Sequence, residues 1–417
     1  MAHILLVETP PDDESTILQE AARLGHQVTF FSSDIDYFRE NGNLEAILRP
    51  LTREIIYTER GAYSYEAFER LVLAVHAKHP FDAVMCLHDV HIVVAAQVAE
   101  RLSLPFLNAA TARLARDKYS VREALARYKV HQPTFALARS EQELREAAKR
   151  LGYPLLVKPS DGMGSQNVSV FRSEEELNAR LAAGSDVLPR NFDYGYLVHS
   201  NNRFVVERFM SGPIVGCDVF TRHGERVFLG VHEKRFFPPP SFAIAGSCFP
   251  CERFDTAAIR DYAFRVLDAV DFNHGAAHLE IMLTDKGPHL IELNPRLIGA
   301  RVSDHIGMVF ERSIHEDLIA LHLGEPLTGL KAAKPRRFVA SRWVVADRPG
   351  ILQSIETPDT TAPHIHSFRL YKKPGDAVIP PRINHDRVAR VLTLGATQEE
   401  AERLADSFVF NTRLHIQ

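Results

Sequence analysis

The chain has 417 residues, more than a single hydrophobic core usually serves, and this length predicts two or three domains. Its formal net charge of −4 lacks the basic footprint of a protein that binds nucleic acid or an anionic membrane, so we expect neither partner. No stretch approaches the roughly 18 apolar residues of a membrane span. The first residues carry no basic leader, and four cysteines are typical of free thiols in a reducing compartment. We therefore expect a cytoplasmic protein.

Strands and helices alternate over the first hundred residues. Strand patterns lie at 4–7, 28–31 and 83–87, and helical patterns at 14–24, 67–76 and 92–102. This alternation predicts a parallel sheet covered on both faces. The first turn, which begins at Glu8, lacks the glycine that a dinucleotide pyrophosphate needs, and this excludes a Rossmann cofactor site. His88 and His91 flank a strand end, where such sheets bind ligands, but single histidines are more often structural.

A glycine-rich segment follows two predicted helices, at 111–128 and 140–151. It reads LLVKPSDGMGSQNVSV, residues 155–170. Its lysine precedes the glycines, unlike a phosphate loop, and alternating β-branched residues follow, so the glycines form the tip of a β-hairpin. Such a tip can bring backbone N–H groups to nucleotide phosphate, and an ordinary Asp-Gly hairpin is the alternative. Because two glycines and small polar residues make up most of the tip between Ser160 and Gln166, we expect the tip to be mobile without nucleotide and to order on binding ATP.

Acidic residues occur on two apolar strands near residue 280. Strands at 277–283 and 289–293 follow a predicted helix at 257–270 and are joined by a short turn, which predicts a hairpin. Glu292 and Asn294 share one face of their strand, and the pairing can place Glu280 beside them. Two carboxylates and an amide oxygen suit a Mg²⁺ ion that also holds substrate phosphates. The alternative is surface acids paired with arginines, but a carboxylate in an apolar strand is unfavourable unless it is satisfied.

Three further segments carry weaker signals. Cys248 and Cys251 form a C-x-x-C, but the H-x-E at 278–280 follows it, the reverse of the zinc deaminase order, so we expect free thiols. The segment 231–246, VHEKRFFPPPSFAIAG, is interpreted as a rigid solvated connection or as a substrate-lining segment with His232 near an attacking amine. Residues 324–337 are a predicted linker. Short strands follow, then a helix from about Gln398 and a final strand.

Several of these segments together resemble the ATP-grasp superfamily. They are RDKYSVREAL, YPLLVKPSDGMGSQNVSV, FVVERFMSGP and HLEIMLTDKGPHLIELNPRLIGA, in that order. The tail from residue 363, PHIHSFRLYKKPGDAVIPPRINHDRVARVLTLGATQEEAERLA, is similar to the C-terminal part of carboxylate–amine ligases related to L-amino-acid ligases, including dipeptide ligases of peptide-antibiotic biosynthesis, and to biotin carboxylase.

The resemblance implies an α/β (α+β) fold in four parts. A parallel α/β domain would span 1–110, and linker helices with the small ATP-grasp subdomain and its glycine-rich lid 111–205. The large subdomain with the metal site would span 206–325, and a small C-terminal α+β piece 326–417. ATP would lie between two antiparallel sheets.

The resemblance also implies a role for individual residues. The predicted ATP ligands are Lys118 and Lys158, the lid residues Ser160, Gly162, Gly164 and Ser165, and the hinge Glu207, Arg208, Phe209 and Met210 at the adenine edge. One or two Mg²⁺, or Mn²⁺ in their place, would bind Glu280, Glu292 and Asn294. The predicted catalytic residues are Arg296 at the acyl phosphate, Arg301 at a substrate carboxylate, and His232. Ile214 stands where family members often carry an acidic ribose ligand, so no ribose contact is assigned.

The implied activity is an ADP-forming ligation of a carboxylate to an amine through an acyl phosphate, with amino acids as substrates. The alternatives are a purine-pathway or carboxylase-type enzyme that uses formate or bicarbonate, and a nucleotide-binding regulator without catalysis. The regulator should have lost the acids at 280 and 292, and both are present. We expect small-molecule substrates and a homodimer.

Overall fold

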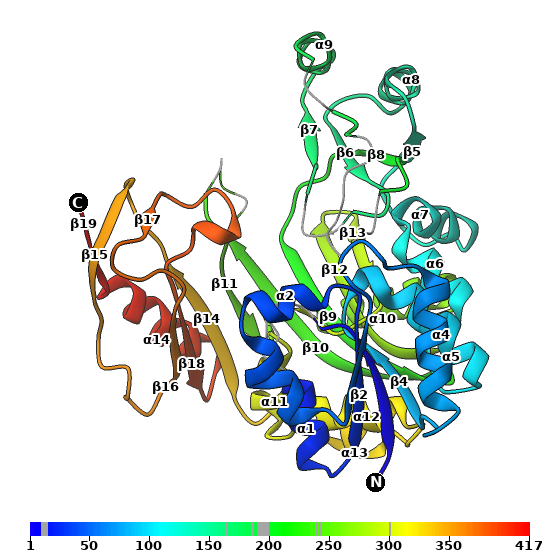
Figure 1. Ribbon diagram of the computed structural model, residues 1–417. Helices are drawn as coiled ribbons and strands as arrows, with labels where there is room; N and C mark the ends of the chain where they lie inside the picture. The colour runs from blue at the N-terminus through cyan, green and yellow to red at the C-terminus, as the bar shows by residue number, and fades with distance from the viewer. Residues whose placement is uncertain are drawn as a thin grey trace.

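The computed structural model describes residues 1–9, 16–162, 166–184, 187–189, 200–238, 241, 243–299 and 302–417. Two sheets dominate the architecture. A small sheet with its helices forms a lobe that projects from the body of the molecule, and a large sheet runs through that body (Figure 1). Within the described residues, no helix has both the length and the apolar character needed to cross a membrane.

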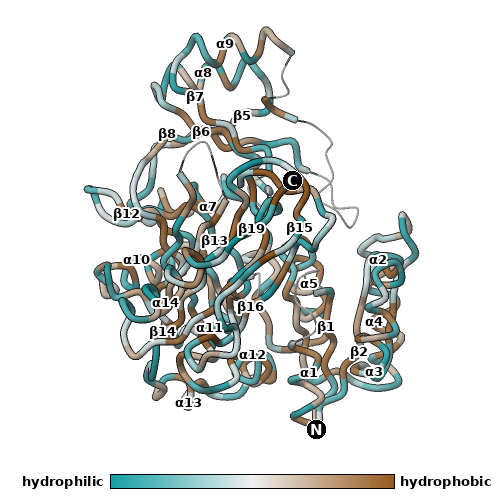
Figure 2. The backbone as a smooth tube through the Cα atoms, turned by 90° about the vertical axis from the view of Figure 1, so that its left-hand side faces the viewer, coloured by the Kyte–Doolittle hydropathy of each residue, from teal (hydrophilic) through white to brown (hydrophobic). Residues whose placement is uncertain are grey.

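The N-terminal domain is the predicted parallel α/β unit. Its strands pair in the order β3-β2-β1-β4, all parallel. Alternate residues of β1 enter different cores, Ile4 and Leu6 on one face and Leu5 and Val7 on the other, because strand side chains alternate between faces. Apart from His3 at its start, the strand is hydrophobic, and it is drawn mainly in brown (Figure 2). The elements are β1 (His3–Val7), α1 (Thr16–Arg23), β2 (Gln27–Ser32), α2 (Ile35–Glu40), α3 (Arg49–Leu51), β3 (Glu54–Tyr57), α4 (Tyr65–His76), β4 (Ala83–Cys86) and α5 (Ile92–Leu102).

The predicted helix at 111–128 is wrong, because two helices occupy this stretch. These are α6 (Ala109–Arg116) and α7 (Lys118–Arg127). Asp117 between them is extended, and its carboxylate accepts a hydrogen bond from Ser120 N–H at 2.7 Å. An Asp in this position caps the N-terminus of a new helix, and this cap places Lys118 at the first position of α7.

The small sheet has the order β5-β8-β6-β7 and is antiparallel. The pairing of β6 with β7 confirms the predicted hairpin, whereas residues 163–165 of its tip lie outside the described residues. Leu144 of α8 and Leu177 of α9 pack on its apolar face. The elements are β5 (Phe135–Ala138), α8 (Glu141–Leu151), β6 (Leu155–Pro159), β7 (Ser169–Phe171), α9 (Glu174–Ala182) and β8 (Phe204–Arg208).

The large sheet has the order β13-β12-β9-β10-β11-β14-β18-β16. One face of β9 and β12 packs on α10 through residues such as Cys217, Val219 and Leu279, and the opposite face carries polar side chains. The elements are β9 (Ile214–Arg222), β10 (Glu225–Phe236), β11 (Ile244–Phe249), α10 (Thr256–Ala269), β12 (His274–Thr284), β13 (Gly287–Asn294), α11 (Ser303–Phe310), α12 (Ile314–His322), α13 (Thr328–Ala332), β14 (Phe338–Val344), β16 (Ile365–Leu370) and β18 (Ala389–Gly395).

Two predicted connections are secondary structure instead. Residues 231–236 belong to β10, so the interpretation of 231–246 as a solvated connection is wrong for its first part. The predicted linker at 324–337 contains α13, whose Leu330 is buried in the core. Because β14 follows α13 and pairs with β11, the large sheet continues across the boundary predicted at 325–326.

The C-terminal part adds three strands to the large sheet and a small sheet of its own. This separate C-terminal sheet has the order β17-β15-β19 and is formed by β15 (Gly350–Glu356), β17 (Ala377–Val378) and β19 (Arg413–Ile416). Helix α14 (Gln398–Phe410) packs on β14 and β18.

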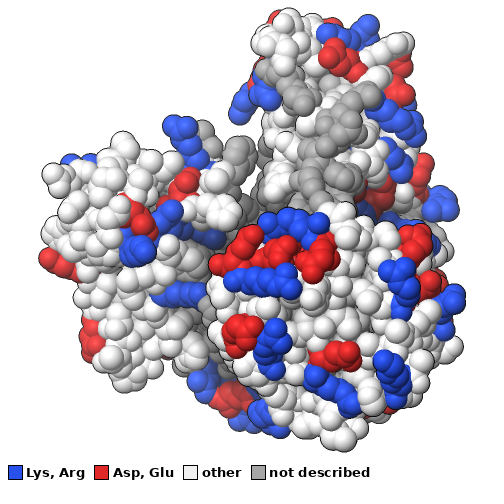
Figure 3. Space-filling view, viewed as in Figure 1, with Lys and Arg blue, Asp and Glu red and all other residues white. Residues whose placement is uncertain are grey.

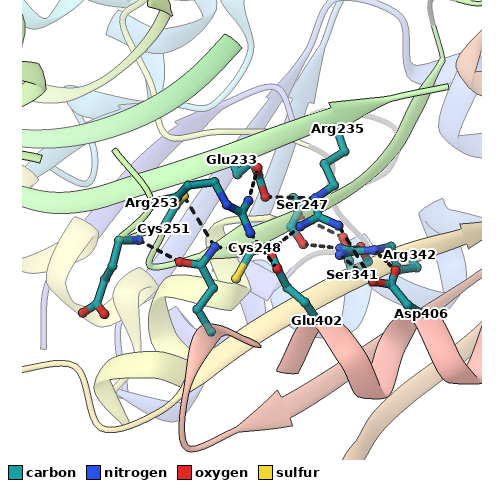
Figure 4. Close-up of polar contacts among 12 residues, drawn as sticks. Glu233, Arg235, Ser247, Cys248, Cys251, Arg253, Ser341, Arg342, Glu402 and Asp406 are labelled. Carbon is teal, nitrogen blue, oxygen red and sulfur yellow. Dashed lines mark hydrogen bonds and ion pairs between the residues drawn. The ribbon is translucent and has the colours of Figure 1, made fainter. Parts of the chain in front are cut away.

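A ring of ion pairs joins α14 to strand β10. Arg235 and Arg253 each contact both Glu233 of β10 and Glu402 of α14 (Figure 4). This ring lies on the odd-numbered face of β10, so His232 and Lys234 point to the opposite face of the sheet. On the surface viewed in Figure 3, charges of both signs are interspersed, in keeping with the small net charge.

Candidate active site

The first part of the site links the small sheet to β13. Lys158, at the end of β6, places Nζ 3.0 Å from Glu207 Oε2 and donates to the carbonyl of Ile291 at 3.2 Å. The fully buried Arg122 of α7 binds the other oxygen, with Nε 2.7 Å from Glu207 Oε1. Both oxygens of Glu207 therefore face cations. The side chain predicted at the adenine edge is held by two basic residues.

These contacts set the charges of the cluster. Burial raises the pKa of Glu207, but Arg122 and Lys158 outweigh it and hold the pKa at about 2. Burial lowers the pKa of Lys158, and Glu207 opposes that effect. In the rest of the predicted hinge, the N–H of Arg208 donates to Thr134 and the N–H of Phe209 to Pro154, so these donors are used within the small sheet. Met210 is the second residue after the end of β8.

Lys118 connects the predicted lid to the predicted metal site. Its Nζ lies 2.5 Å from the carbonyl oxygen of Gly162 and 2.8 Å from Glu292 Oε1. Its backbone N–H donates to the carbonyl of Ser160 at 2.7 Å. A Cβ on Gly162 would lie 3.2 Å from the Cβ of Pro159, so the turn is close-packed there. Lys118 thus contacts three other predicted site residues, Ser160, Gly162 and Glu292, whereas Gly164 and Ser165 lie outside the described residues.

The two predicted metal carboxylates lie opposite each other. In the register of β12 with β13, Glu280 pairs with Glu292 and His278 with Asn294. Glu280 is ion-paired with Lys234 of β10, as Glu292 is with Lys118. Burial raises the pKa of Glu280, but Lys234 outweighs it and the pKa is about 2. Each of the two acids therefore lies against the ammonium group of a lysine.

This arrangement fits a Mg²⁺ ion that shares its coordination with nucleotide phosphates. The described residues contain no group of three or more His, Cys, Asp or Glu side chains able to hold a metal by themselves. Mg²⁺ commonly takes one or two carboxylates and completes its shell with phosphate oxygens and water. Glu280 and Glu292 supply such a pair, and Asn294 stands one position along the same face.

A buried acid that the sequence analysis missed lies behind Glu280. Asp218 of β9 is fully buried, and its Oδ2 is 3.2 Å from His278 Nδ1 and from His232 Nε2. Its Oδ1 accepts from the N–H of Ile298 at 2.9 Å. Burial raises the pKa of Asp218, but the two histidines outweigh it and the pKa is lowered. An acid in the middle of an apolar strand, IVGCDVFTR, was the signal that could have revealed it.

His232 occupies a different place from the one expected. Its side chain is fully buried and stacks on Phe249 with ring centroids 4.2 Å apart. It contacts Asp218 and is not at the surface of the molecule. The expectation that His232 lines a substrate path is therefore corrected, because it supports the site from within the sheet.

Arg296, a predicted catalytic residue, lies just after the end of β13. Its Nη2 lies 2.5 Å from Asp89 Oδ2 of the N-terminal domain, and its Nη1 donates to the carbonyl of Leu297 at 2.8 Å. The guanidinium thus joins the N-terminal domain to the large sheet. Arg301 lies outside the described residues.

The histidine pair after β4 and the cysteines of the C-x-x-C motif, to which no function was assigned from the sequence, are buried. His88 and His91 are buried with their Nδ1 atoms 3.2 Å apart, and burial lowers the pKa of His88 to about 4. Cys248 and Cys251 are buried free thiols, as predicted, and so are Cys86 and Cys217.

Three segments of the chain match known protein families. Residues 151–304 match an ATP-grasp domain, and residues 18–106 match an ATP-grasp N-terminal domain. The chain belongs to the ATP-grasp superfamily. Residues 342–417 match L-amino acid ligase C-terminal domain 2.

Curated relatives are distant. An uncharacterized protein of Sinorhizobium fredii, y4rH, is 26% identical over 92% of this chain and 84% of its own length. Carnosine synthase 1 of Gallus gallus is 25% identical over 83% of this chain, but the match covers only 38% of that longer protein.

Solved structures share the fold. L-amino acid ligase from Bacillus licheniformis matches with a TM-score of 0.79 at 20% identity, covering 100% of this chain and 99% of that one. The biotin carboxylase domain of Hydrogenobacter thermophilus 2-oxoglutarate carboxylase, solved with MgADP and bicarbonate, matches with a TM-score of 0.70 at 16% identity, covering 100% of this chain and 91% of that one. At these identities the similarity establishes the ATP-grasp fold alone.

Proposed function

We propose that this ATP-grasp protein is an ADP-forming ligase that joins a carboxylate to an amine, with amino acids as substrates and a dipeptide-like product. The observation that carries the proposal is the convergence of Lys118, Lys158, Glu280 and Glu292 between the two sheets. Lysines meet phosphate oxygens, and paired carboxylates suit the accompanying metal. The C-terminal domain shared with L-amino acid ligases supports the substrate class.

The residues present suit two successive displacements. A carboxylate oxygen of the acid substrate attacks the γ-phosphorus of ATP, the bond to the β-phosphate oxygen breaks, and ADP leaves. The amine nitrogen then attacks the acyl carbon, the bond to the phosphate oxygen breaks, and the nitrogen gives up a proton. Mg²⁺ held by Glu280, Glu292 and Asn294 would screen the phosphate oxygens when bound. Lys118 and Lys158 would hold the terminal phosphates, and Arg296 would stabilise the oxyanion of the second step.

Other parts of the proposal concern recognition and assembly. Arg301 remains a candidate for pairing with a substrate carboxylate, as do Gly164 and Ser165 for the phosphates. Ile214 begins β9, and no ribose ligand is assigned there. The homodimer and the cytoplasmic location expected from the sequence remain predictions.

A carboxylase-type activity is the second candidate, because the biotin carboxylase domain solved with bicarbonate shares the fold. Incubation of the purified protein with Mg²⁺ and ATP, first with single amino acids and then with pairs, separates the two. We expect ADP and phosphate, with an amide that requires both substrates. AMP and pyrophosphate would contradict the acyl-phosphate mechanism, and phosphate release with bicarbonate alone would favour the second candidate.

A further inference from the structure

An ion pair between two domains holds the guanidinium of Arg296. Asp89 opens a short helical turn just after β4, 207 residues away in sequence from Arg296. Only 4% of Asp89 is exposed, and its Oδ2 lies 2.5 Å from Arg296 Nη2. The N-terminal domain and the large sheet therefore meet at this guanidinium.

Burial makes this pair mutually dependent. A buried carboxylate is unfavourable unless a cation or several donors compensate it. The neighbouring His88 is neutral, since burial lowers its pKa to about 4, and in the part of the chain that the structure describes Asp89 Oδ1 has no hydrogen-bond partner. Arg296 thus supplies the direct hydrogen bond to Asp89, and the charge of Arg116 adds at longer range.

The same contacts fix the orientation of Arg296. Nη2 is bound by Asp89 and Nη1 by the carbonyl of Leu297, so the plane of the guanidinium cannot turn without losing a contact. The backbone that follows is also held, because the N–H of Ile298 donates to the buried Asp218. Charge stabilisation in a transition state requires donors that are fixed before the reaction begins.

We propose that Asp89 is a positioning residue that orients Arg296 for the attack of the amine on the acyl phosphate. This inference rests on the proposed function. Asp89 itself touches neither reacting group; it acts through Arg296. The lysines that would bind ATP, Lys118 and Lys158, have other partners and do not depend on it. Loss of Asp89 should therefore impair amide formation while ATP binding persists, and more of the acyl phosphate should be hydrolysed.

The test compares Asp89→Asn and Asp89→Glu with the unmodified protein in the ligase assay. For Asp89→Asn we expect the kcat of amide formation to fall about 10- to 100-fold, with KM for ATP within about twofold and a higher ratio of phosphate to amide. Asp89→Glu should recover part of the kcat because it restores the charge. Asp268→Asn, which removes the exposed partner of Arg226, is the matched control and should leave all three quantities unchanged.

A double-mutant cycle decides whether Asp89 acts through Arg296. In an Arg296→Lys background, adding Asp89→Asn should change kcat by less than about twofold, because the group to be positioned is gone. A further large loss of kcat on adding Asp89→Asn to the Arg296→Lys variant would overturn the proposal. So would an unchanged ratio of phosphate to amide, or a loss of kcat that only follows the fraction of folded protein by circular dichroism. If the unmodified protein makes no amide from any acid and amine, the proposed function fails first and this inference with it.

Discussion

At the residue scale, the ammonium of Lys158 and the carboxylate of Glu292 are predicted to act on ATP in different ways. Lys158 is buried beside Glu207 and the carbonyl of Ile291. Glu292 lies opposite Glu280 and is paired with Lys118. The lysine would meet phosphates that are charged before the reaction, whereas the carboxylate would act through the metal on charge that develops during transfer.

Lys158→Ala is therefore predicted to weaken ATP binding, and Glu292→Gln to remove turnover. We expect KM for ATP to rise about 10- to 100-fold in the first variant, in line with about 1.5–3 kcal/mol for a charged hydrogen bond. In the second we expect kcat to fall by about 100-fold or more. Steady-state kinetics and calorimetric titration with MgATP measure both. Lys331→Ala, which removes an exposed partner of Glu225, is the control. Normal turnover in Glu292→Gln would show that the metal assignment is wrong.

At the element scale, the site depends on a close approach within the large sheet. Gly216 of β9 lies between Glu280 of β12 and His232 of β10 in the register. A Cβ at this position would lie 2.7 Å from His278 Cε1. His278 is itself held by Asp218, so its ring cannot move aside without losing that contact. The glycine is needed for the packing of a side chain against the strand, not for its own backbone conformation.

Gly216→Ala should displace His278 and disturb Glu280 beside it. We expect the free energy of unfolding to fall by about 1–3 kcal/mol, as for overpacked cores, and kcat to fall with it. Urea denaturation and the ligase assay measure the two effects. Gly329→Ala in α13 is the matched control, because its Cβ would meet only Arg312 at an ordinary 3.5 Å and alanine favours helix. If Gly216→Ala and Gly329→Ala had the same stability and activity, the close approach of His278 to Gly216 would not be needed for the site, and this explanation would be wrong.

At the scale of the whole molecule, one buried acid in the N-terminal domain makes stability depend on pH. Glu8 is fully buried after β1, where its Oε1 accepts hydrogen bonds from the side chains of Ser32 at 3.1 Å and Ser33 at 2.9 Å. Its Oε2 has no partner among the residues that the structure describes. Burial raises the pKa of Glu8 to about 7, and the hydrogen bonds from Ser33 and Ser32 only partly offset it.

A carboxyl group with a raised pKa in the folded state favours folding at low pH. This contribution is complete below the ordinary pKa of 4.5 and is lost as the pH rises through about 7, because the unfolded chain ionises first. The loss is on the order of 3 kcal/mol from the size of the shift. Glu8→Gln should therefore become more stable relative to the unmodified protein between pH 4.5 and 7. Denaturant titrations at several pH values measure this difference, and parallel curves for the two proteins would contradict the assignment.

Several features of this protein were determined by the sequence itself. Period-two alternation placed Glu292 and Asn294 on one face, and the short turn after β12 brought Glu280 opposite them, since hairpin pairing is local. The alternation of strands and helices likewise predicted the parallel N-terminal sheet. The break at Asp117 was missed because its capping role competes with a helical pattern that continues on both sides.

Only the tertiary structure decided which distant groups meet. Asp89 and Arg296 are 207 residues apart, and nothing local in either segment specifies the other. Lys234 reaches Glu280, and Asp218 lies between His232 and His278, because β10, β9 and β12 are neighbours in one sheet. Strand order and register depend on burying all the apolar faces together, and that is a property of the whole chain. The local pattern predicted the two metal carboxylates, Glu280 and Glu292, and packing decided which lysines, histidines and further acids surround them.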